Sequence, residues 1–238
     1  MTAVASPRPR ARIAGALYLF AIVGGIFAQA EVRERLLVAG NPAATAQSIL
    51  AHEPLFRLGL AVDVLALASY IAITLLLYEL LAPVNKTVSA LGALFSAVGI
   101  AVLAVALLFQ LVTVLLLTGP RYLAAFDTNQ LDAAALFCMK VHGQGYVFSE
   151  IFFGFYCLAL GWLIGRSTFM PRAIGFFLAL TGVCELINSF ANILSPPFAN
   201  AISDYILLPG LLGEGSLTLW LRFAGVNEAR WREAAAAA

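Results

Sequence analysis

The amino-acid sequence predicts an all-α fold, a polytopic membrane helical bundle with six transmembrane helices and short interfacial helices on the outer side. Hydrophobic residues make up 62% of the 238 positions and charged residues only 11%. The apolar residues gather in runs of about 20, the length that a helix needs to cross a bilayer. Strands of a membrane β-barrel would instead alternate over about ten residues. Because only helices and closed barrels satisfy the backbone in lipid, these runs indicate a helical bundle.

The six predicted spans follow one another along the chain. They cover residues 13–30, 58–81, 88–118, 143–165, 173–194 and 205–223. The third is long enough to require tilt or an extension beyond the lipid. The sixth contains Pro209, Gly210, Gly213 and Gly215, so we expect it to be irregular and to be satisfied by neighbouring helices or water.

Positive charge predicts the orientation. With the N-terminus inside, most Arg and Lys side chains fall on the cytoplasmic side of these spans, as the positive-inside rule requires. Both termini are then cytoplasmic, with tails of residues 1–11 and 226–238 around a membrane domain of residues 12–225. Arginine outnumbers lysine and alanine is abundant, which indicates a GC-rich bacterial genome. We therefore expect a multi-pass protein of the bacterial cytoplasmic (inner) membrane.

A cleavable signal peptide is the alternative interpretation of the first span. The start is basic, an apolar stretch follows, and Ala28-Gln29-Ala30 resembles a signal-peptidase site. Cleavage would leave five spans without changing the orientation of the rest. Because the other spans can insert unaided, we predict that the first span is retained.

Two outer segments are predicted to form short helices. Asn41 and Pro42 have the pattern of an N-cap followed by proline at the first helical position, before a helix over residues 43–52. In residues 127–139, Thr128 is placed to cap a second short helix. These helices either roof a cavity or serve only as interfacial connectors.

Ionisable residues inside the apolar spans are the main functional candidates. They are Asp63, His142, Glu150, Glu185 and Glu214. A charge at the centre of a membrane helix costs about 2.5–3.5 kcal/mol on insertion scales, so it rarely lacks a partner or a purpose. With a rise of about 1.5 Å per residue, the carboxylates lie in the outer half of the bilayer or near its centre. The sequence therefore predicts a single polar layer that opens toward the outer face.

Helical phase adds polar neighbours to this layer. Glu185, Asn188 and Asn192 are spaced i, i+3, i+7 and form one stripe. We take Glu150, Glu185 and Glu214 as the catalytic candidates. The binding candidates are Asp63, His142, Tyr146, Ser149, Asn188 and Asn192. Asp63 has Arg57 and Lys140 as its expected ion-pair partners.

Two interpretations of the layer stay open. It is either a hydrogen-bonded network that fixes helix packing or a site for a ligand, a proton or catalysis. The sequence predicts no metal site and no cofactor, because it lacks HxxxH, HxxEH and ExxH spacings, a P-loop, a dinucleotide fingerprint and a nucleophile elbow. Cys138, Cys157 and Cys184 fit neither a zinc nor a disulfide pattern, and we interpret them as small buried hydrophobic residues.

The leading functional prediction is an integral membrane protein with a carboxylate-lined pocket in the outer half of the bilayer. This pocket would bind a small lipophilic or amphipathic molecule. One alternative is an intramembrane enzyme that uses acid–base carboxylates on an isoprenoid or lipid. Another is a proton-coupled carrier, against which the nearly apolar inner half argues. Expected partners are membrane lipids and the lipophilic ligand, whereas a net charge of +1 gives no reason to expect nucleic acid. The oligomeric state stays open.

Several short segments resemble a known family in their order and spacing. They are RIAGALYL at 12–19, FRLG at 56–59, LLAPVNK at 80–86, YLAAF at 122–126, HGQG at 142–145 and SFAN at 189–192. Together they resemble the bacterial membrane family called domain of unknown function 4386, from about Arg12 to Gly225. The resemblance implies a six-span bacterial membrane protein and no established activity. It includes His142 and Asn192, which favours a functional polar layer.

Overall fold

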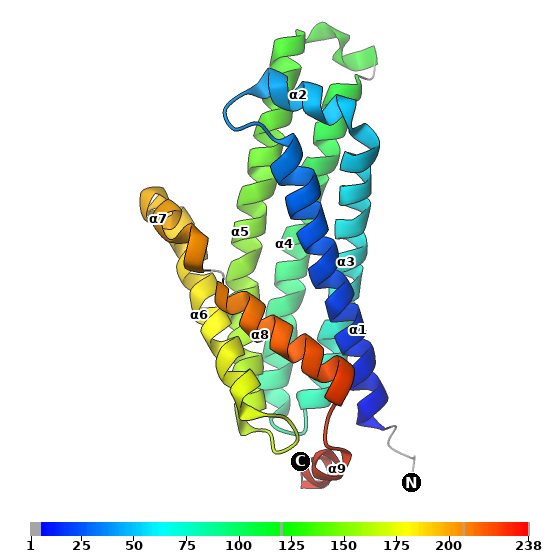
Figure 1. Ribbon diagram of the computed structural model, residues 1–238, viewed down its shortest axis with the longest axis vertical. Helices are drawn as coiled ribbons and strands as arrows, with labels where there is room; N and C mark the ends of the chain where they lie inside the picture. The colour runs from blue at the N-terminus through cyan, green and yellow to red at the C-terminus, as the bar shows by residue number, and fades with distance from the viewer. Residues whose placement is uncertain (1–5, 120, 207, 238) are drawn as a thin grey trace. The chain divides into compact units, whose positions relative to one another are not determined.

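The computed structural model describes residues 6–119, 121–206 and 208–237, without the side chains of residues 121, 122 and 204. Within these residues every regular element is helical and no strand occurs, so the all-α prediction is confirmed. The α-helices are α1 (Pro7–Ile26), α2 (Pro42–Ala51), α3 (Glu53–Leu81), α4 (Lys86–Thr118), α5 (Thr128–Arg166), α6 (Arg172–Leu194), α7 (Pro196–Ile206), α8 (Leu208–Leu219) and α9 (Glu228–Ala237) (Figure 1). The π-helices η1 (Phe27–Glu34) and η3 (Trp220–Ala224) extend α1 and α8, and η2 (Arg121–Ala125) is a short 3-10 helix.

Five helical segments in the described part of the chain are long and apolar enough to cross a membrane. They are Pro7–Glu34, Glu53–Leu81, Lys86–Thr118, Thr128–Arg166 and Arg172–Leu194. Several such segments in one chain indicate a multi-pass membrane protein. The predicted sixth span, residues 205–223, falls on the end of α7, on Leu207, which lies outside the described residues, and on α8 and η3. A count of six spans therefore stays a prediction, as do the cytoplasmic tails, whose residues 1–5 and 238 also lie outside the described residues.

The chain divides into two compact units. Unit 1 comprises the chain up to Leu19, Ser69–Ile100 and the chain from Val147 onward, and unit 2 comprises Phe20–Ala68 and Ala101–Tyr146. The helices α1, α3, α4 and α5 contribute residues to both units. We describe each unit by itself.

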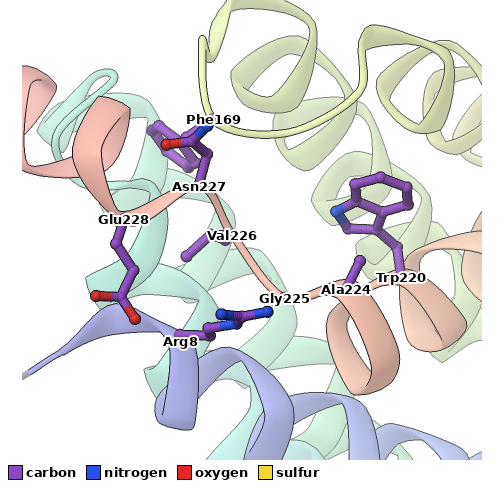
Figure 2. A pocket seen from close by; sticks show the side chains of 8 residues that line it. All are labelled: Arg8, Phe169, Trp220, Ala224, Gly225, Val226, Asn227 and Glu228. Atoms are coloured by element: carbon purple, nitrogen blue, oxygen red, sulfur yellow. The ribbon is translucent and has the colours of Figure 1, made fainter.

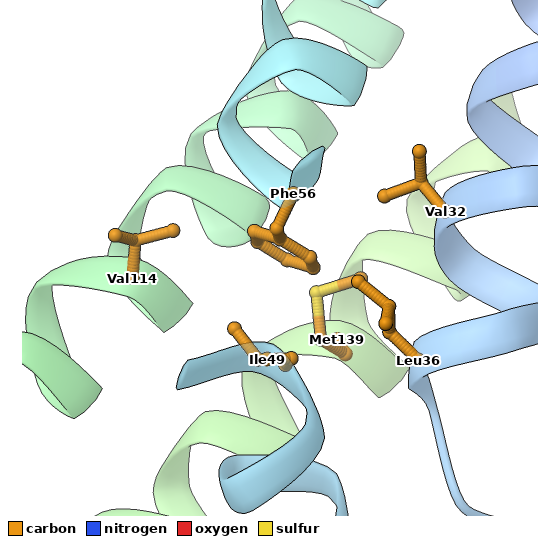
Figure 3. Packing of buried hydrophobic residues seen from close by; sticks show 6 residues of the cluster. All are labelled: Val32, Leu36, Ile49, Phe56, Val114 and Met139. Atoms are coloured by element: carbon orange, nitrogen blue, oxygen red, sulfur yellow. The ribbon is translucent and has the colours of Figure 1, made fainter. Parts of the chain in front are cut away.

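Unit 2 has its own apolar core, in which α2 packs. Figure 3 shows its buried residues, which are Val32, Leu36, Ile49, Phe56, Val114 and Met139. At the start of α2 the backbone N–H of Ala44 donates to Oδ1 of Asn41 at 3.0 Å, and Pro42 occupies the first turn. The predicted N-cap and helix are thus confirmed, because the side-chain oxygen satisfies a backbone donor that the helix leaves free. Its place at a membrane surface stays a prediction.

The second predicted short helix is not a separate element. A helix does begin at Thr128, but α5 continues without a break to Arg166. The sequence between the expected helix and the expected fourth span, Met139 to His142, contains neither proline nor glycine. Nothing there interrupts the backbone hydrogen bonds, so one helix of 39 residues forms instead of two.

In unit 1, α5 and α6 pack with their backbones in close contact. A Cβ added to Gly182 would lie 2.5 Å from the carbonyl oxygen of Gly154, and one on Gly161 would lie 2.7 Å from that of Gly175. Small residues are what allow helices to approach this closely. From the middle of α6, α8 runs obliquely toward the beginning of α1, where Gly15 meets the backbone of Arg222 (Figure 1).

Candidate functional site

The glutamates ranked first from sequence lie together in unit 1, on α5, α6 and α8. We call Glu150, Glu185 and Glu214 the glutamate cluster. Glu150 and Glu185 each lie close enough to Glu214 for their charges to interact. The close contact of α5 with α6 and the hydrogen bond from Oγ1 of Thr181 to the carbonyl oxygen of Pro209, 2.9 Å long, hold the three helices together. The cluster therefore rests on a packed scaffold.

Asparagines of α6 extend the cluster on the side of Glu150. Nδ2 of Asn188 donates to Oε2 of Glu150 at 3.3 Å, and Nδ2 of Asn192 donates to the carbonyl oxygen of Asn188 at 2.9 Å. Asn188 is buried, and Asn192 is half-buried. The polar stripe that the i, i+3, i+7 spacing predicts thus meets the glutamate of the neighbouring helix.

A thiol and a phenol complete the site around the other two glutamates. The buried Cys157 lies against the Glu185 carboxylate, and the buried Tyr18 hydroxyl lies beside Glu214. Sγ of Cys157 and one carboxylate oxygen each of Glu185 and Glu214 lie within 4.8 Å of one another. Oε2 of Glu185 is shielded from solvent and has no hydrogen-bond partner among the described atoms.

No positive side chain balances the glutamate cluster within the described residues. The ion pairs found there join other acids to arginines, such as Glu79 of α3 to Arg10 of α1 at 2.9 Å. Carboxylates in apolar spans normally pair with a cation or hold a proton. The cluster is therefore equipped to hold protons or to receive a positively charged group from outside the chain.

Asp63 and His142 belong to unit 2 and have different partners. Nη1 of Arg33 lies 2.5 Å from Oδ2 of Asp63, and Nε of Arg33 donates to Oε1 of Gln29 at 2.8 Å. The expected partners, Arg57 and Lys140, were wrong: Arg57 pairs with Glu53 at 2.7 Å, within its own helix. The π-helix that ends the first span places Arg33 on Asp63, which a sequence reading with regular helices misses.

The other predicted binding residues divide between the units. In unit 2, His142 is buried and its Nδ1–H donates to the carbonyl oxygen of Ala106 at 3.0 Å, whereas Tyr146 is 45% exposed. In unit 1, Ser149 is buried on the same helix as Glu150. The structure thus brings the glutamates and asparagines together in unit 1, and a single layer that also includes Asp63 and His142 stays a prediction.

Sequence reasoning missed several members of these sites. Cys157 follows Glu150 by two helical turns and therefore lies on the same face of the helix. We did not include it in the site because the sequence has no zinc motif. Gln110 lies inside the third apolar span, eight residues before its end, and Oε1 of Gln110 accepts from Nη1 of Arg33 at 3.4 Å. A lone amide in such a span is a useful signal of a buried polar site.

Two open pockets lie elsewhere in unit 1. One, of about 450 Å³, is lined by Arg8, Phe169, Trp220, Ala224, Gly225, Val226, Asn227 and Glu228 (Figure 2). The other, of about 370 Å³, lies beside the loops that follow α3 and α5. Neither is lined by a residue of the glutamate cluster.

Comparison with known proteins gives one result. A model of the family described as "Domain of unknown function (DUF4386)" matches residues 13–225, nearly the whole chain. No curated protein and no solved structure matches the sequence.

Proposed function

The chain belongs to the DUF4386 family, and from that premise we propose that it is a six-span protein of the bacterial cytoplasmic membrane that binds a small amphipathic molecule. The polar head of this molecule carries a positive charge or hydrogen-bond donors and contacts Glu150, with Asn188 and Asn192 beside it. The observation that carries the proposal is the glutamate cluster, which no cation of the described residues balances.

Contacts at one end of unit 1 support the six-span topology. The helix α6 begins at this end with Arg172. The backbone N–H of Asn227, which follows η3, donates to the carbonyl oxygen of Phe169 at 3.2 Å, so the chain returns to the same end after α8 and η3. The return path runs obliquely from the middle of α6 through α8 and η3, whose helical length is roughly 25 Å (Figure 1).

Both termini then lie on one side of the membrane. Oγ of Ser6 donates to Oε1 of Glu228 at 2.8 Å, which puts the beginning of α1 beside α9. The arginines near this end, such as Arg8 and Arg230, favour the cytoplasm by the positive-inside rule.

The surroundings of Glu150 favour an amphipathic ligand. Its carboxylate accepts from Asn188, and a different face of α6 exposes the apolar side chains Ile187 and Phe190, each at 44%. An ammonium group gains most from a carboxylate in a low dielectric, and an alkyl chain gains from apolar side chains. The Glu150 carboxylate offers the first of these contacts, and the exposed apolar face of α6 offers the second.

Thermal unfolding of the full chain in phosphatidylcholine nanodiscs tests the proposal. Dodecylamine should stabilise the protein, by about 2.7 kcal/mol at a free concentration 100 times its dissociation constant, and dodecanol should not. Glu150→Gln should fold and lose most of this stabilisation. Glu79→Gln is the matched control, since Glu79 already pairs with Arg10, and it should keep the effect.

Two results would contradict the proposal. Equal stabilisation by dodecylamine and dodecanol would show that the head group is not recognised. Unfolding of every Glu→Gln variant of the cluster in detergent would show that these carboxylates only hold the helices together. Consumption of an added lipid would instead favour the alternative that the protein is an intramembrane enzyme. Proton-driven uptake of the ligand into vesicles would favour a proton-coupled carrier.

A further inference from the structure

We propose that Cys157, Glu185 and Glu214 form a binding site for one divalent transition-metal ion of the zinc type. The inference goes beyond the proposed function, because it concerns other groups. The head group at Glu150 would leave the carboxylates of Glu185 and Glu214 and the thiol of Cys157 without a ligand.

The donor atoms already converge. Sγ of Cys157 and one oxygen from each glutamate lie within 4.8 Å of one another, although they come from α5, α6 and α8. Metal–ligand bonds of about 2.0–2.3 Å require donors slightly closer than this, so small side-chain rotations bring all three onto one ion. The sequence contains no metal motif because each helix contributes a single donor.

The state of Glu185 supports a missing ligand. Its Oε2 is shielded from solvent and has no hydrogen-bond partner among the described atoms, although its carboxylate belongs to the converging set. A buried acceptor without a partner is rare in proteins, and a bound ion is a recognised reason for one. Independently, none of the ion pairs in the described part of the chain includes Glu185 or Glu214.

The surrounding structure is suited to holding such an ion. The Tyr18 hydroxyl lies beside Glu214, where a hydrogen bond from it would orient the carboxylate. Partners that orient metal ligands typically change affinity by about 10–100-fold when they are removed. Gly154 and Gly182 have no side chains, so α5 and α6 pack closely at this point. Both glycines lie three residues before a donor, Cys157 and Glu185 respectively.

The donor types select the class of metal. Magnesium and calcium prefer oxygen ligands alone, whereas a thiolate favours zinc and related softer ions. Three protein ligands leave a fourth position for water or another molecule, as in catalytic zinc sites. Binding forms the metal–sulfur bond and releases the thiol proton to the solvent.

Cobalt(II) is the probe that tests the site. Purified full chain without an affinity tag, stripped with a chelator and kept in a thiol-free reductant, should bind one Co²⁺ per chain and show thiolate-to-cobalt charge-transfer absorption. Zn²⁺ should displace the cobalt. Cys157→Ser should abolish this absorption, and Glu214→Gln should weaken Zn²⁺ binding at least about tenfold.

The other two cysteines provide matched controls. Cys138→Ser and Cys184→Ser should keep the absorption, since neither sulfur belongs to the converging set. Absence of stoichiometric Co²⁺ binding overturns the proposal, and so does absorption that survives in Cys157→Ser. If Cys157→Ser does not fold, the Zn²⁺ affinities of Glu185→Gln and Glu214→Gln decide, and unchanged values overturn it.

The outcome is separable from that of the proposed function. Dodecylamine stabilisation of the metal-free protein without Co²⁺ binding refutes only the metal site. Co²⁺ binding without any effect of dodecylamine refutes only the amphipathic ligand.

Discussion

The buried ion pair of unit 2 makes a sharp prediction about stability. Arg33 and Asp63 expose only 9% and 12% of their side chains, so each single substitution leaves an unpaired charge in an apolar setting. Removing one partner of a buried pair costs about 3–5 kcal/mol, whereas replacing both with apolar residues is neutral or stabilising by about 1–4 kcal/mol. We therefore expect Asp63→Leu and Arg33→Met to be damaging singly and harmless together.

The neighbours of the pair predict which single substitution is worse. After Asp63→Leu, the guanidinium keeps its hydrogen bond to Gln29 at 2.8 Å, so the cost should lie near about 3 kcal/mol. After Arg33→Met, Asp63 has no other recorded partner among the described residues, so the cost should approach about 5 kcal/mol. If these two costs were additive, the double variant would lose about 8 kcal/mol.

Reversible unfolding by SDS in mixed micelles measures these free energies. The expected result is a double variant at least as stable as the wild type. Glu53→Gln is the control: it breaks the exposed pair with Arg57 and should cost less than about 1 kcal/mol. Additive losses in the double variant would refute the argument, because they would mean that each side chain stabilises the protein independently of the other.

Three further predictions concern packing and capping. Gly161→Val places a Cβ 2.7 Å from a backbone oxygen of α6 and should cost about 1–3 kcal/mol, whereas Gly165→Ala, with nothing within 4 Å, should be nearly neutral in the same unfolding assay. Trp231→Phe removes the indole N–H that donates to the carbonyl oxygen of Leu80 at 2.8 Å; thermal unfolding should show a loss of about 1–3 kcal/mol, and an unchanged midpoint would speak against this bond. Asn41→Ala removes the cap of α2 and should cost about 0.5–2 kcal/mol, seen as faster amide exchange in α2 while α6 stays protected.

Much of the fold was predictable because its determinants are local. Asn41 followed by Pro42 predicts the start of a helix, because the capping hydrogen bond joins Asn41 to a residue only three positions later. The stripe of Glu185, Asn188 and Asn192 follows from helical phase alone and does meet the glutamate of the next helix. The division of α5 into a short helix and a span was wrong. Our prediction locates helices by their apolar runs, and a helix that continues through polar residues near Met139 is not detected in this way.

Partner choice was not predictable. Asp63 pairs with Arg33 because a π-helix changes the phase of the first span, and a regular helical reading assigned the aspartate to Arg57 or Lys140 instead. Cys157 is buried and free, as predicted, but its contact with Glu185 was not predicted, since nothing near it in the chain is a ligand. Both contacts join residues of different helices.

By itself the sequence determined that the chain is all-helical, that it has several membrane-length apolar helices, and that Glu150, Glu185 and Glu214 are the residues to explain. Composition and a period of 3.6 residues suffice for this, because the backbone of each helix satisfies its own hydrogen bonds. Only the tertiary structure decided which polar groups meet: the glutamates with Cys157, Tyr18 and Asn188, and Asp63 with Arg33. Such meetings depend on glycine-mediated helix contacts and on the phase of irregular turns, and neither can be read from one helix at a time.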